Sequence, residues 1–565
     1  MASVSFKLFK GISPKLDPKE LQGGYAQIAS NIDLTSGKIN PLKSPLASGS
    51  STVSAVAKSL YGFPNGAGTL WFEDNDEHSV VQGAVPGTTE NRTYLSGGAV
   101  PEMTYASLNT GVAPFPNTTR RLGVPPPVSA PGIGTPSTKD EHTDPADSDK
   151  ITTAYVCTYV TDQYEEGPPS VPSGLIDIYY VDQEVTVTVP STPSITTPMG
   201  APTPNITKVR IYRVATGTTG AAYQYVTETT PGSVITDGTL TENLAASITS
   251  TNWLPPPPFN TVAVSSTTYQ YDWAYPTGAL KGLTMMANGI MAGYTGKEIC
   301  FSEAYYPHAW PEEYRITIDY DIVGLAAVGQ TLVVSTKGNP YLVTGVSPNS
   351  LTQTKLEVNQ ACVSSRSMVD MGESVLYAAP DGIVQVKSFG AKLVTGDIID
   401  RDYWQSLTPS GIHAYYWEDK YVGFHSTGGF IYAPSSNDFT TFTHTATAGH
   451  NILEEDSLYI SQGTSITKWA QGTAGTFTWK SAELMLDKPL AFSAVQVIGH
   501  HTVAEPVVLT LTLDGVEQTA VSITSNSPVR LPSYPRVYKY EIQVSGTTTV
   551  DSITLGNTIK DLGSL

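Results

Sequence analysis

The sequence has few cysteines and no long apolar run. Its three cysteines, Cys157, Cys300 and Cys362, lie far apart, and no Cys-x-x-Cys pair occurs. This spacing argues against a disulfide framework and a zinc site, so we expect buried free thiols. No apolar run approaches the roughly 20 residues of a membrane-spanning helix. The first residues also lack the apolar region of a signal peptide, so we expect a soluble protein that is made in the cytoplasm and not exported.

Positive charge is also scarce. The chain has 32 Lys and Arg against 51 Asp and Glu, which gives a net charge of -19. Binding to a phosphate backbone needs clustered Lys and Arg, and no basic run of that type is present. The acidity is compatible with plain solubility, with protein partners, or with DNA that slides past without adhering.

Motifs of catalysis and ligand binding are absent as well. The sequence contains no GxSxG elbow, no P-loop and no HExxH pair. The acidic run at residues 73–77 lacks the regular alternation and the glycine of a calcium loop, which favours a solvated hairpin tip. We therefore predict no catalytic, cofactor-binding or metal-binding residue, no cofactor and no enzyme activity.

The amino-acid composition of the chain is typical of short strands joined by turns. It has 49 Gly and 41 Pro, with Thr, Ser, Val and Tyr between them. Only two segments favour a helix. One runs from Asp17 and Pro18 towards Ala29, and a short one starts at Asp400.

Five similar units fill residues 283–472. Each has an apolar strand, a tight polar turn and a second apolar strand, and the units start 38 to 45 residues apart. This period is typical of four-stranded β-propeller blades, although a sandwich or solenoid is an alternative. The predicted turns are Asn288-Gly289, Val328-Gly329, Met371-Gly372, Glu418-Asp419 and Glu455-Asp456.

A sixth unit is expected upstream, at residues 53–105, so that residues 1–110 and 268–475 would form one domain closed by N-terminal strands. The predicted fold class is all-β: a propeller of about six blades, interrupted by an inserted fibronectin-III-like sandwich and followed by a C-terminal sandwich. The boundaries are 1–112 for the N-terminal segment and first propeller strands, 113–150 for a Pro-rich and acidic linker, 151–258 for the inserted sandwich, 259–475 for the main propeller part and 476–565 for the C-terminal sandwich.

Several stretches resemble the tail tubular protein B, or tail nozzle, family of short-tailed bacteriophages. The most specific is ICFSEAYYPHAWPEEY at residues 299–314, and the opening FKGISPKLDPKELQGGYAQIASNIDLTSGKINPLKSP is similar to the start of many phage tail proteins. Further support comes from DYDIVGLAAVGQTLVVSTKGNPYLVTG, ACVSSRSMVDMG, DIIDRDYWQSLTP, SNSPVRLPS and YEIQVSGTTTVDSITLG.

The resemblance implies a virion structural protein at the distal end of a short tail. It implies a homohexameric ring below an adaptor or gatekeeper protein, possible contacts with tail fibres, and a channel that passes viral DNA without specific binding. The alternative is a receptor- or glycan-binding propeller at the tail tip. The most specific run supplies the assembly candidates: Tyr305, Tyr306, Pro307, His308, Trp310 and Pro311. A rigid loop packed on the propeller is the competing interpretation of that run.

Overall fold

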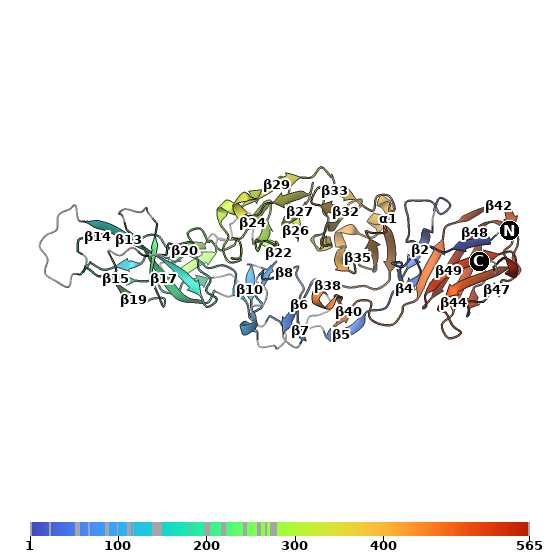
Figure 1. Ribbon diagram of the computed structural model, residues 1–565, viewed down its shortest axis with the longest axis horizontal. Coiled ribbons are helices and arrows are strands. Elements are labelled where there is room, and N and C mark those ends of the chain that lie inside the picture. Colours follow the sequence, from blue (N-terminus) through green and yellow to red (C-terminus); the bar gives the residue numbers. More distant parts are fainter. Residues whose placement is uncertain are drawn as a thin grey trace.

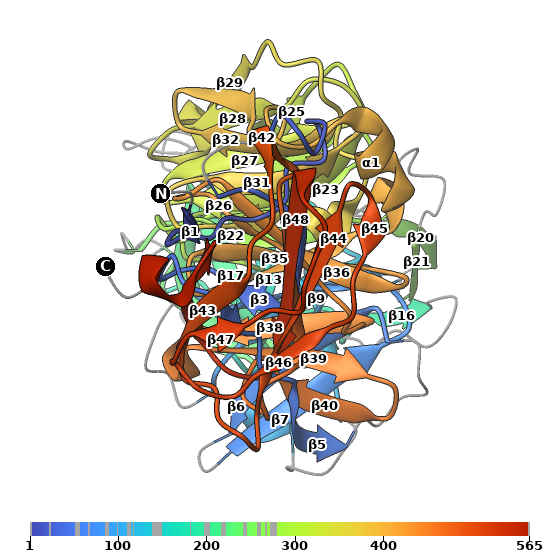
Figure 2. The same ribbon diagram turned by 90° about the vertical axis from the view of Figure 1, so that its right-hand side faces the viewer.

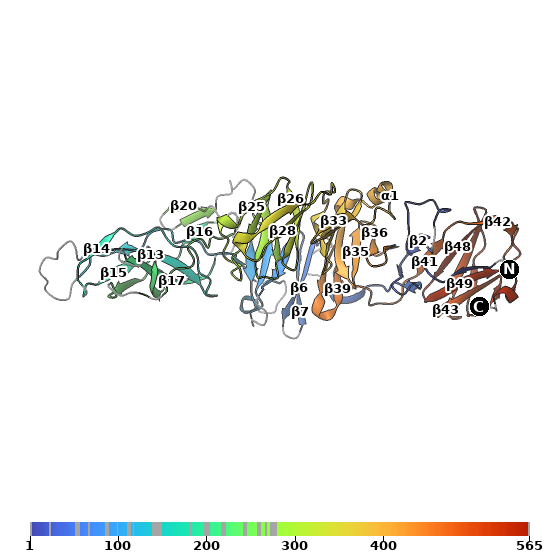
Figure 3. The ribbon, with the colours of Figure 1, turned by 45° about the horizontal axis from the view of Figure 1, so that its top comes forward.

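The computed structural model describes residues 3–21, 24–50, 57–65, 68–84, 90–98, 100–109, 115–116, 118–137, 150–180, 182–196, 204–215, 222–240, 244, 246–256, 261–265, 268–271 and 279–562. Three β modules follow one another along an elongated molecule, and both chain ends lie in the same terminal module (Figures 1 and 3). The predicted all-β class is confirmed, because α1, Arg401–Ser406, is the single α-helix of the described residues. Short 3-10 turns occur at Ala106–Leu108, Glu312–Tyr314, Pro348–Ser350, Ser365–Ser367, Pro409–Gly411, Leu453–Glu455 and Ile559–Asp561.

The two helix predictions had different outcomes. Helix α1 begins where predicted, because the Asp400 side chain accepts a hydrogen bond from the backbone N–H of Tyr403 and caps it. The helix predicted from Pro18 towards Ala29 is wrong. Within the described part of that segment, turns lead into strand β2, Ala26–Ser30, which pairs with β41, Phe477–Ser481. Pairing with a distant strand outweighs the local helix signals.

The middle module consists of small antiparallel sheets arranged in a circle, and we call it the ring. Each predicted repeat supplies strands of one of these sheets. The first two sheets are β22 Lys281–Met285, β23 Met291–Thr295, β24 Glu298–Phe301, β25 Ile316–Thr317, and β26 Ile322–Val328, β27 Thr331–Thr336, β28 Tyr341–Thr344, β29 Thr352–Lys355. The next two are β30 Val369–Asp370, β31 Val375–Ala379, β32 Gly382–Lys387, β33 Gly390–Leu393, and β34 His413–Trp417, β35 Lys420–His425, β36 Gly428–Ala433, β37 Asp438–Phe442. The fifth has β38 Ala448–Ile452, β39 Ser457–Gln462 and β40 Ser465–Lys468, and its fourth strand is the N-terminal β5, Leu46–Ser50.

The predicted turns between the first and second strands are confirmed. Each contains a residue in the left-handed region, where glycine and short polar side chains are tolerated best. These residues are Gly289, Gly329, Gly372, Asp419 and Asp456.

The ring closes through the segment upstream of the inserted sandwich. The sequence predicted one unit at 53–105, whereas the structure divides this region between a hairpin and most of a further four-stranded sheet. The hairpin is β6 Ser59–Asn65 and β7 Gly68–Asp74, and the sheet is β8 Ser79–Gln82, β9 Thr93–Ser96, β10 Glu102–Thr104 and β11 Arg120–Arg121.

The first strands of the sheets lie side by side around the ring. Strand β38 contacts β6, β8 contacts β22, and the order continues through β26, β30 and β34 back to β38. The hairpin β6–β7 meets the sheet of β8 and β9 through an apolar cluster of Tyr61, Phe63, Phe72, Leu95 and Phe115. Figure 2 views this arrangement from the end that carries both termini.

The inserted sandwich places two antiparallel sheets around one core of valines, isoleucines and tyrosines. One sheet has β12 Gly132–Ile133, β15 Val185–Thr188 and β19 Val234–Asp237, and the other has β14 Ile176–Ile178, β13 Ile151–Thr161, β17 Ile206–Ala215 and β18 Gln224–Thr229. A small sheet of β16 Ser194–Thr196, β20 Thr261–Ser265 and β21 Thr268–Tyr271 accompanies them. Part of the predicted linker, residues 113–114, 117 and 138–149, lies outside the described residues.

The terminal sandwich shares a sheet with the ring. Strand β2 pairs with β37 of the ring on one side and with β41 on the other, so one sheet runs from β34 through β2 into β48, Val537–Gly546, and β44, Val507–Leu513. The same sheet carries β42 Leu484–Leu490, β45 Val516–Glu517 and β46 Val521–Ile523, and the facing sheet has β43 Ala494–Gly499, β47 Val529–Arg530 and β49 Val550–Gly556. A hairpin of β3 Ile32–Asp33 and β4 Asn40–Pro41 completes the strands.

The first strand departs from the expected domain division. Strand β1, Ser3–Phe6, pairs with β49 in the facing sheet of the terminal sandwich rather than with a ring strand. Further along, the N-terminal segment meets the ring at β2, which pairs with β37, and at β5 it supplies a strand of a ring sheet. The N-terminal segment therefore contributes to two modules.

Candidate functional site

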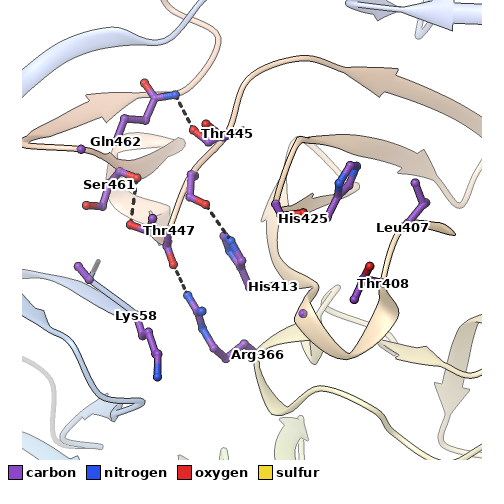
Figure 4. Close-up of a pocket in the computed structure, with 15 residues that line it drawn as sticks. Lys58, Arg366, Leu407, Thr408, His413, His425, Thr445, Thr447, Ser461 and Gln462 are labelled. Carbon is purple, nitrogen blue, oxygen red and sulfur yellow. Dashed lines mark hydrogen bonds between the residues drawn. The ribbon is translucent and has the colours of Figure 1, made fainter. Parts of the chain in front are cut away.

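The segments that precede the first strands of the ring converge on one of its faces. Lys58 stands directly before β6, Arg366 precedes β30, and Thr447 directly precedes β38. Between them lies a cavity of about 460 Å³, which we call the axial cavity. It is drawn in Figure 4. Its volume is within the range of small-molecule sites, roughly 300–1,000 Å³.

The lining of the axial cavity has a charge of one sign. Lys58 and Arg366 line it, and no Asp or Glu does, although the chain as a whole carries a net charge of -19. Arg366 donates to the backbone carbonyl of Thr447, as Figure 4 shows. Neither cation forms an ion pair with a described carboxylate, and Lys58 is exposed. Arg366 and Lys58 give this lining two positive charges, which suit an anion.

Two histidines of the lining are neutral at neutral pH. Burial, followed by the nearby charge of Arg366, lowers the pKa of His413 to about 3. The ring of His413 donates through Nε2 to the Ala446 carbonyl at 3.0 Å, so Nδ1 accepts from the Tyr415 hydroxyl at 2.9 Å. Burial also lowers the pKa of His425. His413 is thus a fixed wall of the cavity, with both ring nitrogens engaged.

One lining residue holds a strained backbone. Thr408 has φ of 55° and ψ of 69°, in the left-handed region. It is β-branched and precedes Pro409, and both features disfavour this conformation. Its side chain is exposed in the wall of the cavity and makes no capping hydrogen bond. Strain of this kind persists only where the surrounding structure imposes it, and it concentrates at functional sites.

A second cavity of about 720 Å³ opens beside β8, β22 and β26 and also has Arg366 in its wall. Its charges are mixed. Glu77 accepts a hydrogen bond from the Ser365 hydroxyl at 2.8 Å, and Lys337 pairs with Asp321 at 3.2 Å. The axial cavity is therefore the one of the two that suits an anion.

The predicted assembly candidates lie elsewhere, in the loop after β24 where the ring meets the inserted sandwich. His308, Trp310, Pro307 and Pro311 are buried, and the Trp310 backbone N–H donates to the Leu254 carbonyl at 2.7 Å. By contrast, Tyr305 is 58% and Tyr306 45% exposed. The loop thus divides into a buried contact within the chain and two tyrosines that a partner can reach.

The remaining sequence-based candidates stay apart. The three cysteines are free and buried, as predicted. The acidic run ends β7 and turns there, where the Asp74 carboxylate accepts from the backbone N–H of Asp76 at 2.7 Å. Across the described ranges, no group of three or more His, Cys, Asp or Glu is placed to hold a metal.

Sequence reasoning missed Arg366 and Lys58. The available signal was the start of each repeat, because residues that directly precede the first strands of a ring share one of its faces. Lys58 stands at such a position and Arg366 lies three residues before β30, whereas catalytic motifs are local patterns.

Comparisons with known proteins give no family. No protein-family model matches the chain, and no curated protein matches it. Among solved structures it is similar to the Neurospora crassa Pan2 WD40 domain, with 4% identity and a TM-score of 0.23 over 37% of this chain and 68% of that one. It is also similar to BamB from Moraxella catarrhalis, with 10% identity and a TM-score of 0.22 over 47% and 84%. Virginiamycin B lyase from Staphylococcus aureus matches with 8% identity and a TM-score of 0.25 over 69% and 98%. Likeness at these scores carries no inference about activity.

No helix among the described residues has the length and apolar character needed to cross a membrane.

Proposed function

We propose that this chain is a virion structural protein, a tail nozzle or tail tube component that forms the distal part of a short phage tail and a conduit for DNA ejection. In this role it is not an enzyme. The resemblance of residues 299–314 to nozzle proteins suggests the role. The observation that carries it is the rigid connection between successive modules, which suits the wall of a tube.

The connection between the ring and the terminal sandwich is a continuous sheet. Strand β2 hydrogen-bonds to both modules, and the backbone N–H of Ile12 donates to the Phe439 carbonyl at 2.8 Å. One apolar core continues across the boundary, with Phe439 of the ring and Trp479 of the sandwich among its members. Rotation of one module against the other would break these hydrogen bonds and open the shared core, so both oppose it.

The connection at the other end is made of side-chain contacts. The Trp253 ring of the insert packs against Tyr306 of the ring module, with centroids 4.6 Å apart. Arg92 of the ring donates to the Gln163 carbonyl of the insert at 3.1 Å. A subunit that is stiff along its length can pack side by side with copies of itself around an axis.

Two finer assignments belong to the same proposal. We take the ring for a β-propeller, in which the hairpin β6–β7 stands as a unit beside five four-stranded sheets and the strands β34 to β37 of the larger sheet. We take the insert for a sandwich of fibronectin type III kind, which its three-stranded and four-stranded sheets around one core support.

The acidity of the chain fits a conduit. At a net charge of -19, a lumen wall would repel the phosphates of passing DNA rather than hold them. An assembled tube whose lumen is lined by Lys and Arg would contradict this part of the proposal.

The test is the assembly state of the purified full chain. Mass photometry and negative-stain imaging should show closed rings of six copies, alone or after addition of adaptor rings. A chain that stays monomeric at high concentration and does not join adaptor rings would overturn the proposal.

Two single variants test whether Tyr305 lies in the contact between subunits. Tyr305→Ser removes an exposed aromatic from the predicted assembly loop and should weaken ring formation. Phe389→Ser removes an even more exposed aromatic, from the turn between β32 and β33, and should leave assembly unchanged. Equal assembly of both variants would remove Tyr305 from the interface.

A further inference from the structure

We propose that the axial cavity is a binding site for a small hydroxylated anion, a sugar that carries a carboxylate, with Arg366 and Lys58 holding the acid group. This site is independent of the assembly role and needs no partner chain.

The charge distribution is the first argument. The chain contains more acidic than basic residues, 51 against 32. The cavity lining differs from this composition, because its only formally charged residues are two cations. Glu73 accepts from the hydroxyl of the lining residue Ser461 at 3.4 Å, but it is buried and does not itself line the cavity. An anion in the cavity would therefore meet Arg366 and Lys58 without a carboxylate in front of them.

The geometry of Arg366 is the second argument. Its guanidinium donates to the Thr447 carbonyl, and the side chain also hydrogen-bonds to Tyr415. These contacts fix its orientation, and since a guanidinium has five N–H donors they leave others for a ligand. A guanidinium held in this way can donate two parallel hydrogen bonds to a carboxylate. Lys58 belongs to a different segment, so the two cations approach the cavity from separate parts of the ring (Figure 4).

The remaining lining favours hydroxyl groups on the ligand. Thr408, Ser426, Thr445 and Thr447 supply hydroxyls, and the neutral His425 adds a ring that can donate or accept. The strained backbone of Thr408 presents its side chain in this wall at an energetic cost. A sugar acid would meet the two cations with its carboxylate and these groups with its hydroxyls, whereas a bare anion such as phosphate has no hydroxylated ring to place against them.

Isothermal titration calorimetry at low ionic strength tests the site, with glucuronate, glucose and inorganic phosphate as probes. Glucuronate should bind saturably. Glucose should bind more weakly by about tenfold or more, since it lacks the charge-assisted hydrogen bonds. Phosphate should also bind more weakly than glucuronate. Equal binding of glucose would overturn the anion assignment, and equal binding of phosphate would overturn the sugar assignment.

Variants connect the binding to the cavity. Arg366→Gln and Lys58→Gln should each weaken glucuronate binding by about tenfold. Lys58 is exposed and without an ion pair to any described residue, so its variant should fold normally. The matched control is Lys337→Gln, an exposed lysine in the neighbouring cavity, which should bind like the wild type. No saturable binding by the wild type, or unchanged binding by Lys58→Gln, would overturn the proposal.

Discussion

Glu165 of the inserted sandwich and His308 of the ring lie 4.0 Å apart, between Oε1 and Nδ1, with both side chains almost fully buried. Arg92 approaches the same carboxylate at 3.5 Å. Glu165 Oε2 and His308 Nε2 have no hydrogen-bond partner among the described residues. Two titratable groups are therefore enclosed where two modules meet, with incomplete compensation for their burial.

The free energy of unfolding should depend on pH through the titration of both Glu165 and His308. Burial raises the pKa of Glu165 to about 7, against an opposing effect of Arg92, so its contribution to the free energy of unfolding is present below pH 4.5 and is lost as the pH rises through 7. Burial, and then the charge of Arg92, lowers the pKa of His308 to about 3. Its contribution is present above pH 6.5 and is lost as the pH falls towards 3.

Between pH 4.5 and 6.5 the two effects oppose each other, and single variants should separate them. Relative to the wild type, Glu165→Gln should become more stable as the pH rises through this window. His308→Gln should become more stable, relative to the wild type, as the pH falls through it. Chemical denaturation across the pH range measures both differences. Two differences that are flat with pH would show that the groups titrate normally.

The buried ion pair of the inserted sandwich predicts a large loss of stability. Arg213 donates to Asp237 at 2.7 Å, and both side chains are at most 1% exposed. Tyr155 also donates to Asp237, at 2.8 Å. Arg213→Met leaves the carboxylate buried without its cation, which should cost about 3–5 kcal/mol in the unfolding of this module.

A surface pair on the same sheet gives the control for Arg213. Lys208 pairs with Glu228 at a position where both side chains are about one-third exposed. Lys208→Met should hardly move the denaturation midpoint, because exposed pairs contribute little. A similar effect of the two variants would contradict the burial argument.

Local patterns in the sequence predicted the parts of the fold that local chemistry determines. The turns at Gly289 and Asp419 were predictable because a tight hairpin demands a left-handed backbone there. The cap at Asp400 was predictable for a similar reason. Such signals need only a few neighbouring residues.

Local sequence patterns did not predict which distant segments pair with each other. The Ser5 hydroxyl meets that of Thr554 at 3.0 Å across 549 residues, and nothing in the sequence near Ser5 specifies this partner. The false helix at residues 17–29 has the same cause, since β2 exists only through strands far along the chain. Arg366 belongs to a cavity for the same reason, because only the closed ring brings it near Lys58.

The three cysteines should resist thiol reagents in the folded protein. Burial raises the pKa of Cys157 and Cys300 to about 12 and that of Cys362 to about 11. The reactive species is the thiolate, which is therefore scarce as well as inaccessible. An Ellman assay should count no thiol before denaturation and three after it. Ser410→Cys, at an exposed position, should add one thiol that reacts at once.

The contact between the ring and the terminal sandwich depends on Gly11. A Cβ atom at this position would lie 2.3 Å from the Phe439 carbonyl oxygen, and the Gly11 N–H donates to the Asp438 carboxylate at 3.1 Å. Gly11→Ala should force the N-terminal segment away from β37, at a cost of about 1–3 kcal/mol. Because this segment leads into β2, the two modules should then unfold less cooperatively, and differential scanning calorimetry should resolve two transitions in place of one.

Gly390→Ala is the control, since a Cβ there meets no atom within 4 Å. A single, unshifted transition for Gly11→Ala would mean that the ring and the sandwich are not coupled through this contact.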